Sequence, residues 1–527
     1  MYLVMDMGTS NTRLFLCNGT AVIDGLKEGF GAKLGKTQGR EVLYSNLRLM
    51  ILELLQKHTL TENEIECLVA SGMAGSEMGL CEIPHLPLPA DETKLADGVT
   101  KKSIPDVTSI PFWFVAGLKK MNRNEIGDIM RGEETEIVGI LSSVSNAKNA
   151  VIVLPGTHNK IVLLDENGCI TDFDSTLSGE LTDLVISGSI LAGAVSHQFE
   201  IRETAVLQGM EYAELHGLNA ALFHIRVMEK NGVELNALSS FLYGATLGQD
   251  VKLIRRYANG NTIYLGGNER LQTVYRILLK NERVVPLDRE LADTATRRGL
   301  QRLYQIHKAQ LAKHNTVNAI ESNKIIAIIR NPDPESLFDA MQALYDGGIR
   351  LAEVTFDRSG RITHEETAAT IAALVKRFEG KMLIGAGTVT DCEEVKLAFE
   401  AGASFMISPN CDPSVIALTK KLGLVSMPAA YTPTEIVTAL NSGADYIKLF
   451  PSDQVSADYI KAVKAPLSDA KLIAVGGVNA NNIADFLQMG FCGVGIGSNL
   501  YDKKLIEKKN FSALTELARA ICKSTQK

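Results

Sequence analysis

The sequence predicts an α/β protein with two parts: an N-terminal half made of two related lobes and a C-terminal (β/α)8 TIM barrel. Two observations lead to this prediction. Residues 324–505 alternate short β-rich segments with segments of helical period, and such alternation implies a parallel sheet. In the N-terminal half, a unit of strand, tight turn and strand occurs twice, at residues 1–19 and again at 151–168.

The bulk composition is that of an ordinary enzyme. The 527 residues suffice for about three domains with their own cores. A formal net charge of −7 without a Lys/Arg block argues against a nucleic-acid partner. The eight cysteines include no C-x-x-C pair, so we expect reduced thiols and no zinc site. No apolar run approaches the roughly 18 residues of a spanning helix, and no signal peptide opens the sequence, so we expect a cytoplasmic protein without a membrane partner.

Three glycine-containing turns punctuate the N-terminal half. The first is DMGTSN, between the apolar segments YLVM and LFLC; the second is PGTHN, in VIVLPGTHNKIVLL; the third is YLGGNER. Such turns present backbone N–H groups and hydroxyls to phosphates, and a carboxylate beside them can hold Mg²⁺ through water. We therefore expect a two-sided clamp for ATP, with the third turn against the adenine and Asp6 as the metal ligand. The candidate residues are Asp6, Gly8, Thr9, Ser10, Asn11, Gly156, Thr157, Gly266 and Gly267.

A charged, helix-favouring stretch at 286–323 separates the two halves. It lacks a clear apolar stripe toward its end, which places the boundary near 310–318. We expect a first domain at 1–312, a linker at 313–323 and the barrel domain at 324–527.

Eight β-rich segments define the barrel, and eight such units close naturally into a (β/α)8 fold. Several of the intervening helices end at glycines expected to act as C-caps, at positions 347, 402, 423, 443 and 490. The eight segments are KIIAIIR, IRLAEVTFD, MLIGAGTV, SFMISPN, LVSMPAA, DYIKLFPS, KLIAVGGV and CGVGIGS.

Functional groups of such barrels lie where the strands end. Lys448 sits among apolar residues, which should lower its pKa and allow the amine to attack a ketone and form a Schiff base. Taken alone, a strand lysine is more often a surface residue, but its neighbours and barrel position favour the interior. Glu353 can carry protons, and the GGV and GS turns offer a phosphate site. The strand-end candidates are Arg330, Glu353, Thr388, Pro409, Lys448, Gly476, Gly477, Gly497 and Ser498.

The motifs IGAGTV, ISPN, IKLFPS, AVGGV and GIGSNLY resemble the 2-dehydro-3-deoxy-phosphogluconate/phosphogalactonate aldolases over 324–503. The resemblance implies that Lys448 is the Schiff-base lysine and Glu353 the proton carrier. It also implies that Arg330 and Thr388 hold the pyruvyl carboxylate, with Gly476, Gly477 and Ser498 cradling the phosphate. Two positions depart from the family pattern: Asp357, with the arginine one place later at Arg358, and Ala429 where a glycine is usual.

The three N-terminal turns, in their order, resemble the actin/hexokinase/sugar-kinase superfamily. More narrowly, SGMAGSEMG, IMRGEET, LPGTHNK and LSGEL resemble the 2-dehydro-3-deoxygalactonokinases over roughly residues 1–305. By analogy with a catalytic aspartate in related kinases, Glu133 is the candidate base. The alternative is that GEET simply starts a helix with acidic residues. Arg13 and Arg131 could bind phosphate or a carboxylate, or lie on the surface.

Together, the resemblances imply a bifunctional enzyme of galactonate breakdown that uses ATP, Mg²⁺ and small sugar acids. The kinase would phosphorylate C6 of 2-dehydro-3-deoxygalactonate, and the aldolase would split the product into pyruvate and glyceraldehyde 3-phosphate. One alternative assigns gluco-configured acids to both activities. A second makes the N-terminal half a non-catalytic sensor of ATP and sugar acid. The barrel resemblance implies a homo-oligomer, by analogy a trimer.

Overall fold

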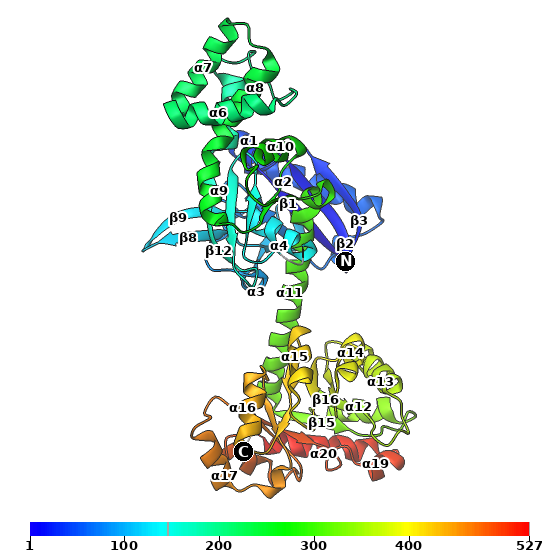
Figure 1. The fold of residues 1–527 in the computed structure, drawn as a ribbon. Helices are drawn as coiled ribbons and strands as arrows, with labels where there is room; N and C mark the ends of the chain where they lie inside the picture. Colours follow the sequence, from blue (N-terminus) through cyan, green and yellow to red (C-terminus); the bar gives the residue numbers. More distant parts are fainter. Residues whose placement is uncertain (145–146, 526–527) are drawn as a thin grey trace. The chain divides into compact units, whose positions relative to one another are not determined.

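The computed structural model describes residues 1–144 and 147–525. The chain divides into two compact units, Met1–His307 and Lys308–Lys527 (Figure 1). Within the described residues, no helix combines the length and apolar character needed to cross a membrane. The eight cysteines are free thiols, as predicted.

The first lobe is built on a six-stranded sheet in the order β3-β2-β1-β4-β7-β6. Its central strand β1 (Tyr2–Met7) pairs antiparallel with β2 and parallel with β4, and its apolar side chains are buried because both faces of the sheet are covered. The other elements of this lobe are β2 (Thr12–Asn18), β3 (Ala21–Glu28), β4 (Leu68–Gly72), β6 (Thr100–Ile104), β7 (Thr108–Phe114), α1 (Ala32–Gln38) and α2 (Arg40–Lys57).

The second lobe repeats this layout in a five-stranded sheet, ordered β12-β11-β10-β13-β14. Here β10 takes the place of β1: it pairs antiparallel with β11 and parallel with β13. The prediction of two related lobes is confirmed. The strands are β10 (Ala150–Leu154), β11 (Asn159–Leu164), β12 (Ile170–Thr176), β13 (Ile263–Leu265) and β14 (Val284–Pro286).

Further helices and a small sheet complete this unit. Helices α6, α7 and α8 gather together beyond the second sheet, and β8 and β9 form a projecting hairpin (Figure 1). The elements are β5 (Leu86–Pro87), α3 (Glu92–Asp97), β8 (Leu118–Asn122), β9 (Glu125–Met130), α4 (Glu133–Ser143), α5 (Ser178–Gly188), α6 (Glu203–His216), α7 (Leu218–Lys230), α8 (Leu235–Leu247), α9 (Val251–Ala258) and α10 (Glu269–Leu278).

Helix α11 (Arg289–Asn323) crosses the division between the units. It includes residues 313–323, for which a linker was expected. The last turns of α11 carry Ile320, which is 1% exposed and packs with the apolar side chains inside the barrel, among them Ile326 and Phe405. These turns therefore belong to the core of the second unit.

The second unit is a parallel barrel, as predicted. Its eight strand positions occur where the β-rich segments were found, but the fifth is broken into two pieces on either side of Pro428. Proline has no N–H to donate, and the Pro428 carbonyl accepts a hydrogen bond from the Lys448 N–H at 2.9 Å. The strands are β15 (Ile325–Ile329), β16 (Leu351–Thr355), β17 (Leu383–Gly387), β18 (Phe405–Ile407), β19 (Val425–Met427), β20 (Ala429–Ala430), β21 (Ile447–Leu449), β22 (Leu472–Val475) and β23 (Gly493–Ile496).

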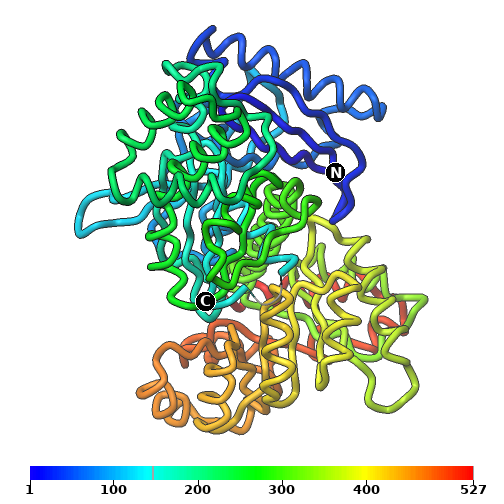
Figure 2. Tube along the Cα trace, turned by 45° about the horizontal axis from the view of Figure 1, so that its top comes forward, coloured from blue at the N-terminus to red at the C-terminus, as the bar shows by residue number. Residues whose placement is uncertain are grey.

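Helices alternate with these strands along the chain, which passes once around the barrel in Figure 2 from yellow-green to red. Four of the five predicted C-cap glycines have positive φ; at the end of α12 the neighbouring Gly348 (φ 107°) takes this role instead of Gly347. The helices are α12 (Leu337–Asp346), α13 (His364–Arg377), α14 (Cys392–Glu400), α15 (Pro413–Lys421), α16 (Pro433–Asn441), α17 (Ala457–Lys464), α18 (Ile483–Gln488), α19 (Lys503–Glu507) and α20 (Phe511–Ser524).

Candidate active sites

Lys448 lies inside the barrel on β21 and is only 8% exposed. Burial lowers the pKa of its ammonium; the charge of Glu353 opposes this shift and that of Arg330 adds to it. The Nζ atom stands 5.1 Å from the centre of the Phe450 ring. The local structure therefore favours the neutral, nucleophilic amine.

Glu353 faces the same interior from β16 and is 2% exposed. Burial raises the pKa of its carboxyl to about 7, against the opposing charges of Lys448 and Arg330. In the described part of the chain, Oε2 is buried and no hydrogen-bond partner reaches it. A carboxyl that titrates near neutral pH beside a buried amine can both accept and return a proton.

A cavity of about 270 Å³ opens at the carboxyl ends of the barrel strands. Five predicted residues line it: Arg330, Gly476, Gly477, Gly497 and Ser498. Gly476 and Gly477 have positive φ, 103° and 67°, a conformation that residues with a side chain rarely adopt. The ring of Phe450 also lines the cavity and thereby joins it to Lys448. Sequence reasoning did not select Phe450, Tyr501 or Lys503, which also line the cavity.

Thr388 and Pro409 lie at strand ends but do not line this cavity among the described residues. Thr388 has a positive φ of 57°, and its carbonyl accepts a hydrogen bond from Arg358 at 2.8 Å. Arg358 also forms an ion pair with the fully buried Glu394 at 2.6 Å. Arg358 thus braces the turn after β17. Pro409 is exposed after β18.

The two departures from the family pattern have structural roles. Asp357 accepts hydrogen bonds from the Ser359 hydroxyl and from the backbone N–H groups of residues 359, 361 and 362, and these bonds hold the pKa of its carboxyl far below the usual range. It caps a loop. Ala429 is buried in β20 and pairs with Lys448 across the sheet.

In the first unit, the turn after β1 is held by a hydrogen bond from the Gly8 N–H to the Asn11 carbonyl at 2.8 Å. Helix α1 begins directly on this turn: the Ala32 and Lys33 N–H groups donate to the carbonyls of Gly8 and Thr9. A Cβ at Gly31 would lie 2.4 Å from the Gly8 oxygen, so only glycine allows this approach.

The turn after β10 repeats the arrangement. The Gly156 N–H donates to the Asn159 side chain at 2.9 Å, and the Glu180 N–H at the start of α5 donates to the Thr157 carbonyl at 2.8 Å. A Cβ at Gly179 would lie 1.8 Å from the Gly156 oxygen.

A buried hydrogen-bond network supports this second turn. Asn159 donates to the Asp250 carboxylate at 2.8 Å, which also accepts hydrogen bonds from Ser178 and Tyr275. These three hydrogen-bond donors satisfy the buried carboxylate of Asp250, which sequence reasoning did not identify.

The third turn lies beside the second. The Gly266 N–H donates to the Val153 carbonyl at 2.9 Å, and a Cβ at Gly267 would lie 3.1 Å from the Pro155 oxygen. The structure thus brings the second and third predicted turns together, each at the carboxyl end of a parallel strand.

Asp6, Glu133 and Glu136 form an acidic group near the first turn. Burial raises the pKa of Asp6, while Arg13 at 3.7 Å opposes the shift. The pKa of Glu136 is raised to about 8 by burial and by the charges of Glu133 and Asp6. Sequence reasoning missed Glu136, although Glu133 and Glu136 are three apart in GEETE and so share a helix face.

Glu133 begins α4, with its carboxylate accepting from the Arg131 N–H at 3.0 Å, so the helix-start interpretation also holds. Burial raises the pKa of Glu133; the charges of Lys160 and then His158 oppose the shift. Both residues belong to the second lobe, so Glu133 lies where the two lobes meet. Lys160 is buried and donates to Ser175 at 2.6 Å.

These carboxylates suit a hydrated Mg²⁺. Across residues 1–144 and 147–525, no group of three His, Cys, Asp or Glu side chains could hold a metal ion unaided. Mg²⁺ in phosphoryl-transfer sites commonly keeps several waters and binds one or two carboxylates together with the substrate phosphates. A cation held near Asp6 would relieve the repulsion from Glu133 and Asp6 that adds to burial in raising the pKa of Glu136.

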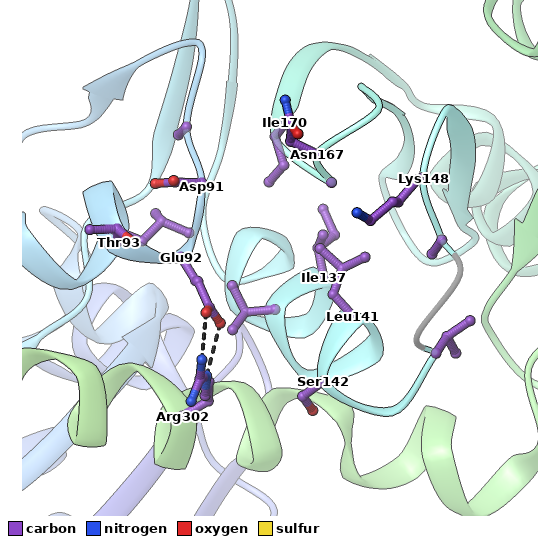
Figure 3. Close-up of a pocket in the computed structure, with 16 residues that line it drawn as sticks. Asp91, Glu92, Thr93, Ile137, Leu141, Ser142, Lys148, Asn167, Ile170 and Arg302 are labelled. Carbon is purple, nitrogen blue, oxygen red and sulfur yellow. Dashed lines mark hydrogen bonds and ion pairs between the residues drawn. The ribbon is translucent and has the colours of Figure 1, made fainter. Parts of the chain in front are cut away.

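A larger cavity of about 520 Å³ lies elsewhere in this unit, among α3, α4 and the turn between β11 and β12 (Figure 3). Arg302 and Glu92 form an ion pair at its edge, at 2.6 Å. No predicted residue lines it among the described residues. Arg131 does not reach it either; its guanidinium donates to the Ile83 carbonyl at 2.6 Å and contacts His85 at 3.2 Å.

Comparison with known proteins gives two family matches. Residues 6–303 match the family described as 2-keto-3-deoxy-galactonokinase, and residues 317–517 match the family described as KDPG and KHG aldolase.

Individual relatives agree with these two family matches. A 2-dehydro-3-deoxygalactonokinase of Escherichia coli (strain K12) is 28% identical over 282 residues, covering 52% of this chain and 88% of the relative. A 2-dehydro-3-deoxy-6-phosphogalactonate aldolase of the same organism is 36% identical over 178 residues, covering 34% and 84%. A probable aldolase of the same name from Rhizobium meliloti (strain 1021) is also 36% identical over 178 residues, covering 34% and 81%.

Proposed function

This chain belongs to the 2-keto-3-deoxy-galactonokinase family through its N-terminal part and to the KDPG and KHG aldolase family through its C-terminal part, and from this premise we propose the reactions it joins. The first part phosphorylates C6 of 2-dehydro-3-deoxygalactonate with ATP. The second cleaves the 6-phosphate to pyruvate and D-glyceraldehyde 3-phosphate. The observation that carries the proposal is the buried pair of Lys448 and Glu353 beside a glycine-lined cavity.

In the cleavage step, the neutral Lys448 amine attacks the C2 ketone, and loss of water gives an imine. The protonated imine withdraws electrons from the C3–C4 bond, which breaks as the C4 hydroxyl loses its proton to a base. The resulting enamine takes a proton at C3, and water then releases pyruvate. Glu353 is the proposed proton carrier, because its pKa of about 7 suits it to both directions of transfer.

The remaining predicted groups of the barrel are proposed to bind substrate. Arg330 is exposed, but its charge acts on both Lys448 and Glu353, so it can hold a carboxylate near the imine. Gly476, Gly477 and Ser498 offer backbone N–H groups to the phosphate. That Thr388 and Pro409 contact the substrate remains a prediction. For Thr388 it is supported by the positive φ of the residue and by the hydrogen bond from Arg358 that holds its turn.

In the kinase step, the C6 hydroxyl oxygen attacks the γ-phosphorus of ATP, the bond to ADP breaks, and the hydroxyl proton passes to a base. Glu133 is the proposed base because it lies where the two lobes meet, facing Lys160. Gly8, Thr9, Ser10 and Asn11 on one side, with Gly156 and Thr157 on the other, are proposed to face the phosphates.

Gly266 and Gly267 are proposed to face the adenine. Mg²⁺, held through Asp6, would neutralise the charge that develops on the phosphates. The domain boundaries at residues 312 and 324 remain a prediction. So does a homo-oligomer, expected to be a trimer, formed through the barrel; the exposed Phe338, Phe399 and Val437 support it.

A coupled reaction tests the proposal. With ATP, Mg²⁺ and 2-dehydro-3-deoxygalactonate, the protein should form ADP and pyruvate. Asp6→Ala should lose ADP formation and still cleave the chemically prepared 6-phosphate, whereas Lys448→Ala should form ADP without pyruvate. Pyruvate formed without ATP would contradict the proposal. The same assay with the gluco epimer tests the alternative configuration, and equal turnover of the two would remove the galacto assignment.

A further inference from the structure

Lys160 is a buried lysine to which the proposed kinase reaction assigns no role. It follows the second glycine-containing turn on β11, is 6% exposed, and lies in a strand whose other side chains are mostly apolar and buried. Burying an ammonium group is unfavourable unless hydrogen bonds or opposite charges compensate for the lost water. The contacts of Lys160 therefore indicate what this side chain does.

The ammonium of Lys160 reaches from the sheet of the second lobe to the end of β9. It donates to the Ile129 carbonyl at 3.0 Å and to the Ser175 hydroxyl at 2.6 Å. That hydroxyl donates in turn to the Asp128 carboxylate at 2.9 Å, which also accepts a hydrogen bond from the Ser175 N–H. Because Lys160 and Ser175 are cross-strand partners on β11 and β12, together they hold the end of β9 against the second lobe.

The chain that leaves β9 is then held by the first lobe. A Cβ at Gly132 would lie 3.2 Å from the Cα of Gly72, the last residue of β4. The hydroxyls of Thr135, in the first turn of α4, and Ser71, on β4, are 2.8 Å apart. The segment that leads from β9 into α4 therefore joins the two lobes, and Glu133 lies on it.

Lys160 also adjoins the turn that is proposed to face the phosphates. Its neighbour Asn159 accepts a hydrogen bond from the Gly156 N–H within that turn, at 2.9 Å. The charge of Lys160 is the largest influence that opposes burial in setting the pKa of Glu133, so the ammonium and the carboxylate face each other. One side chain thus links the phosphate turn, the end of β9 and the region of the proposed base.

We propose that Lys160 is a positioning residue of the kinase reaction, which holds the Ile129 carbonyl and thereby fixes Glu133 relative to the second glycine-containing turn. This inference rests on the proposed function. Phosphoryl transfer depends on the alignment of the attacking hydroxyl, the base and the γ-phosphate. Because α4 carries the base and the turn faces the phosphates, a rigid link between the two preserves this alignment.

Lys160→Met keeps a side chain of similar length and removes its hydrogen-bond donors. In the full-length protein, kcat for ADP formation should fall about 10²-fold, a loss that a small misplacement of reacting groups can cause. KM for ATP and for the sugar acid should not change, because the proposed role of Lys160 involves no contact with either. Cleavage of the 6-phosphate should stay at the wild-type level. Lys160→Arg, which keeps donors and a charge, should recover part of kcat.

A double variant tests whether Lys160 acts through Glu133. If it does, Lys160→Met should not lower kcat further in a protein that already carries Glu133→Gln. Losses that multiply would instead assign the lysine an action of its own, and a raised KM for ATP would make it a phosphate contact. Either result overturns the inference.

Lys120→Met is the matched control. Lys120, on β8 of the same hairpin, forms ion pairs with Asp172 and Asp174 of the second lobe at 2.8 and 2.9 Å. It holds the hairpin to the same lobe, but β8 is not the strand that leads into α4. Lys120→Met should therefore leave kcat for ADP formation unchanged. Equal losses of kcat in the two variants would mean that only the attachment of the hairpin matters, which also overturns the inference.

The remaining outcomes are equally decisive. An unchanged kcat in Lys160→Met overturns the inference. If that variant no longer binds ATP because it has lost its fold, Lys160→Arg takes its place, and its smaller loss of kcat should likewise disappear in the Glu133→Gln protein. The proposed function fails separately: the wild-type protein would then form no ADP, or Glu133→Gln would keep the wild-type kcat, and both are seen before any Lys160 variant is made.

Discussion

Gly387 lies directly against the carboxylate of Glu353. A Cβ at position 387 would stand 2.5 Å from Oε2, the atom that lacks a hydrogen-bond partner in the described residues. The two residues come from neighbouring strands, where Thr355 pairs with Gly387. The missing side chain of Gly387 therefore creates the space that the Glu353 carboxyl occupies.

Gly387→Ala should displace the Glu353 carboxyl and reduce pyruvate formation from the 6-phosphate by about 10²- to 10⁴-fold, the usual contribution of a positioned acid–base group. ADP formation by the kinase part of the same chain should not change, which makes it an internal control for expression and folding. Full retention of cleavage in Gly387→Ala would show that the position of this carboxyl does not matter.

Borohydride reduction in the presence of pyruvate should leave a stable adduct on Lys448, found by peptide mass spectrometry. Lys448→Ala should show no adduct and should lose cleavage by roughly 10³-fold or more, as when other nucleophiles are removed. Lys471→Arg is the matched control, because Lys471 precedes the next strand but is paired with Glu321 at 2.7 Å. An adduct on any lysine other than Lys448 would refute the assignment.

The rate at which the methyl protons of pyruvate exchange with D₂O, followed by NMR at saturating pyruvate, should rise as the pH increases through about 7. At saturation the lysine is already bound as imine, so the titration reports the pKa of Glu353, which burial raises to about 7. The carboxylate form removes the proton, so the rate is low below this pH and high above it. Glu353→Gln should exchange slowly at every pH; a wild-type inflection that persists in this variant must come from another group.

Glu133→Gln should lower kcat for ADP formation by about 10²- to 10⁴-fold without affecting cleavage of the 6-phosphate. Glu134→Gln is a closely matched control. Glu134 is fully buried, and its pKa, raised to about 8 by burial and by Glu133, leaves it largely protonated near pH 7, so glutamine resembles it.

Glu136→Gln is the informative third variant, because Glu136 also lies near Asp6. Should Glu136→Gln lose the activity and Glu133→Gln retain it, the base is Glu136.

Periodicity predicted the barrel well because each of its units is local: a buried strand, a helix and a glycine that ends it. Lys448 and Glu353 could be found for the same reason, since each is a charged residue in a strand segment that is otherwise apolar; the structure places both in the middle of their strands and not at the ends, where they were expected. Pattern reasoning did not anticipate the break of the fifth strand at Pro428, or Gly348 in place of Gly347 at the end of α12. Both depend on single backbone angles and hydrogen bonds.

The sequence by itself determined the order of the elements, the three glycine-containing turns and the residue types that could do chemistry. Only the tertiary structure decided which of these residues share an environment. Burial and charge from several strands together set the pKa of Glu353 near 7, and no local pattern encodes that sum. Likewise, Glu136 beside Asp6 and Lys160 facing Glu133 arise because distant segments pack side by side, which no local sequence pattern records.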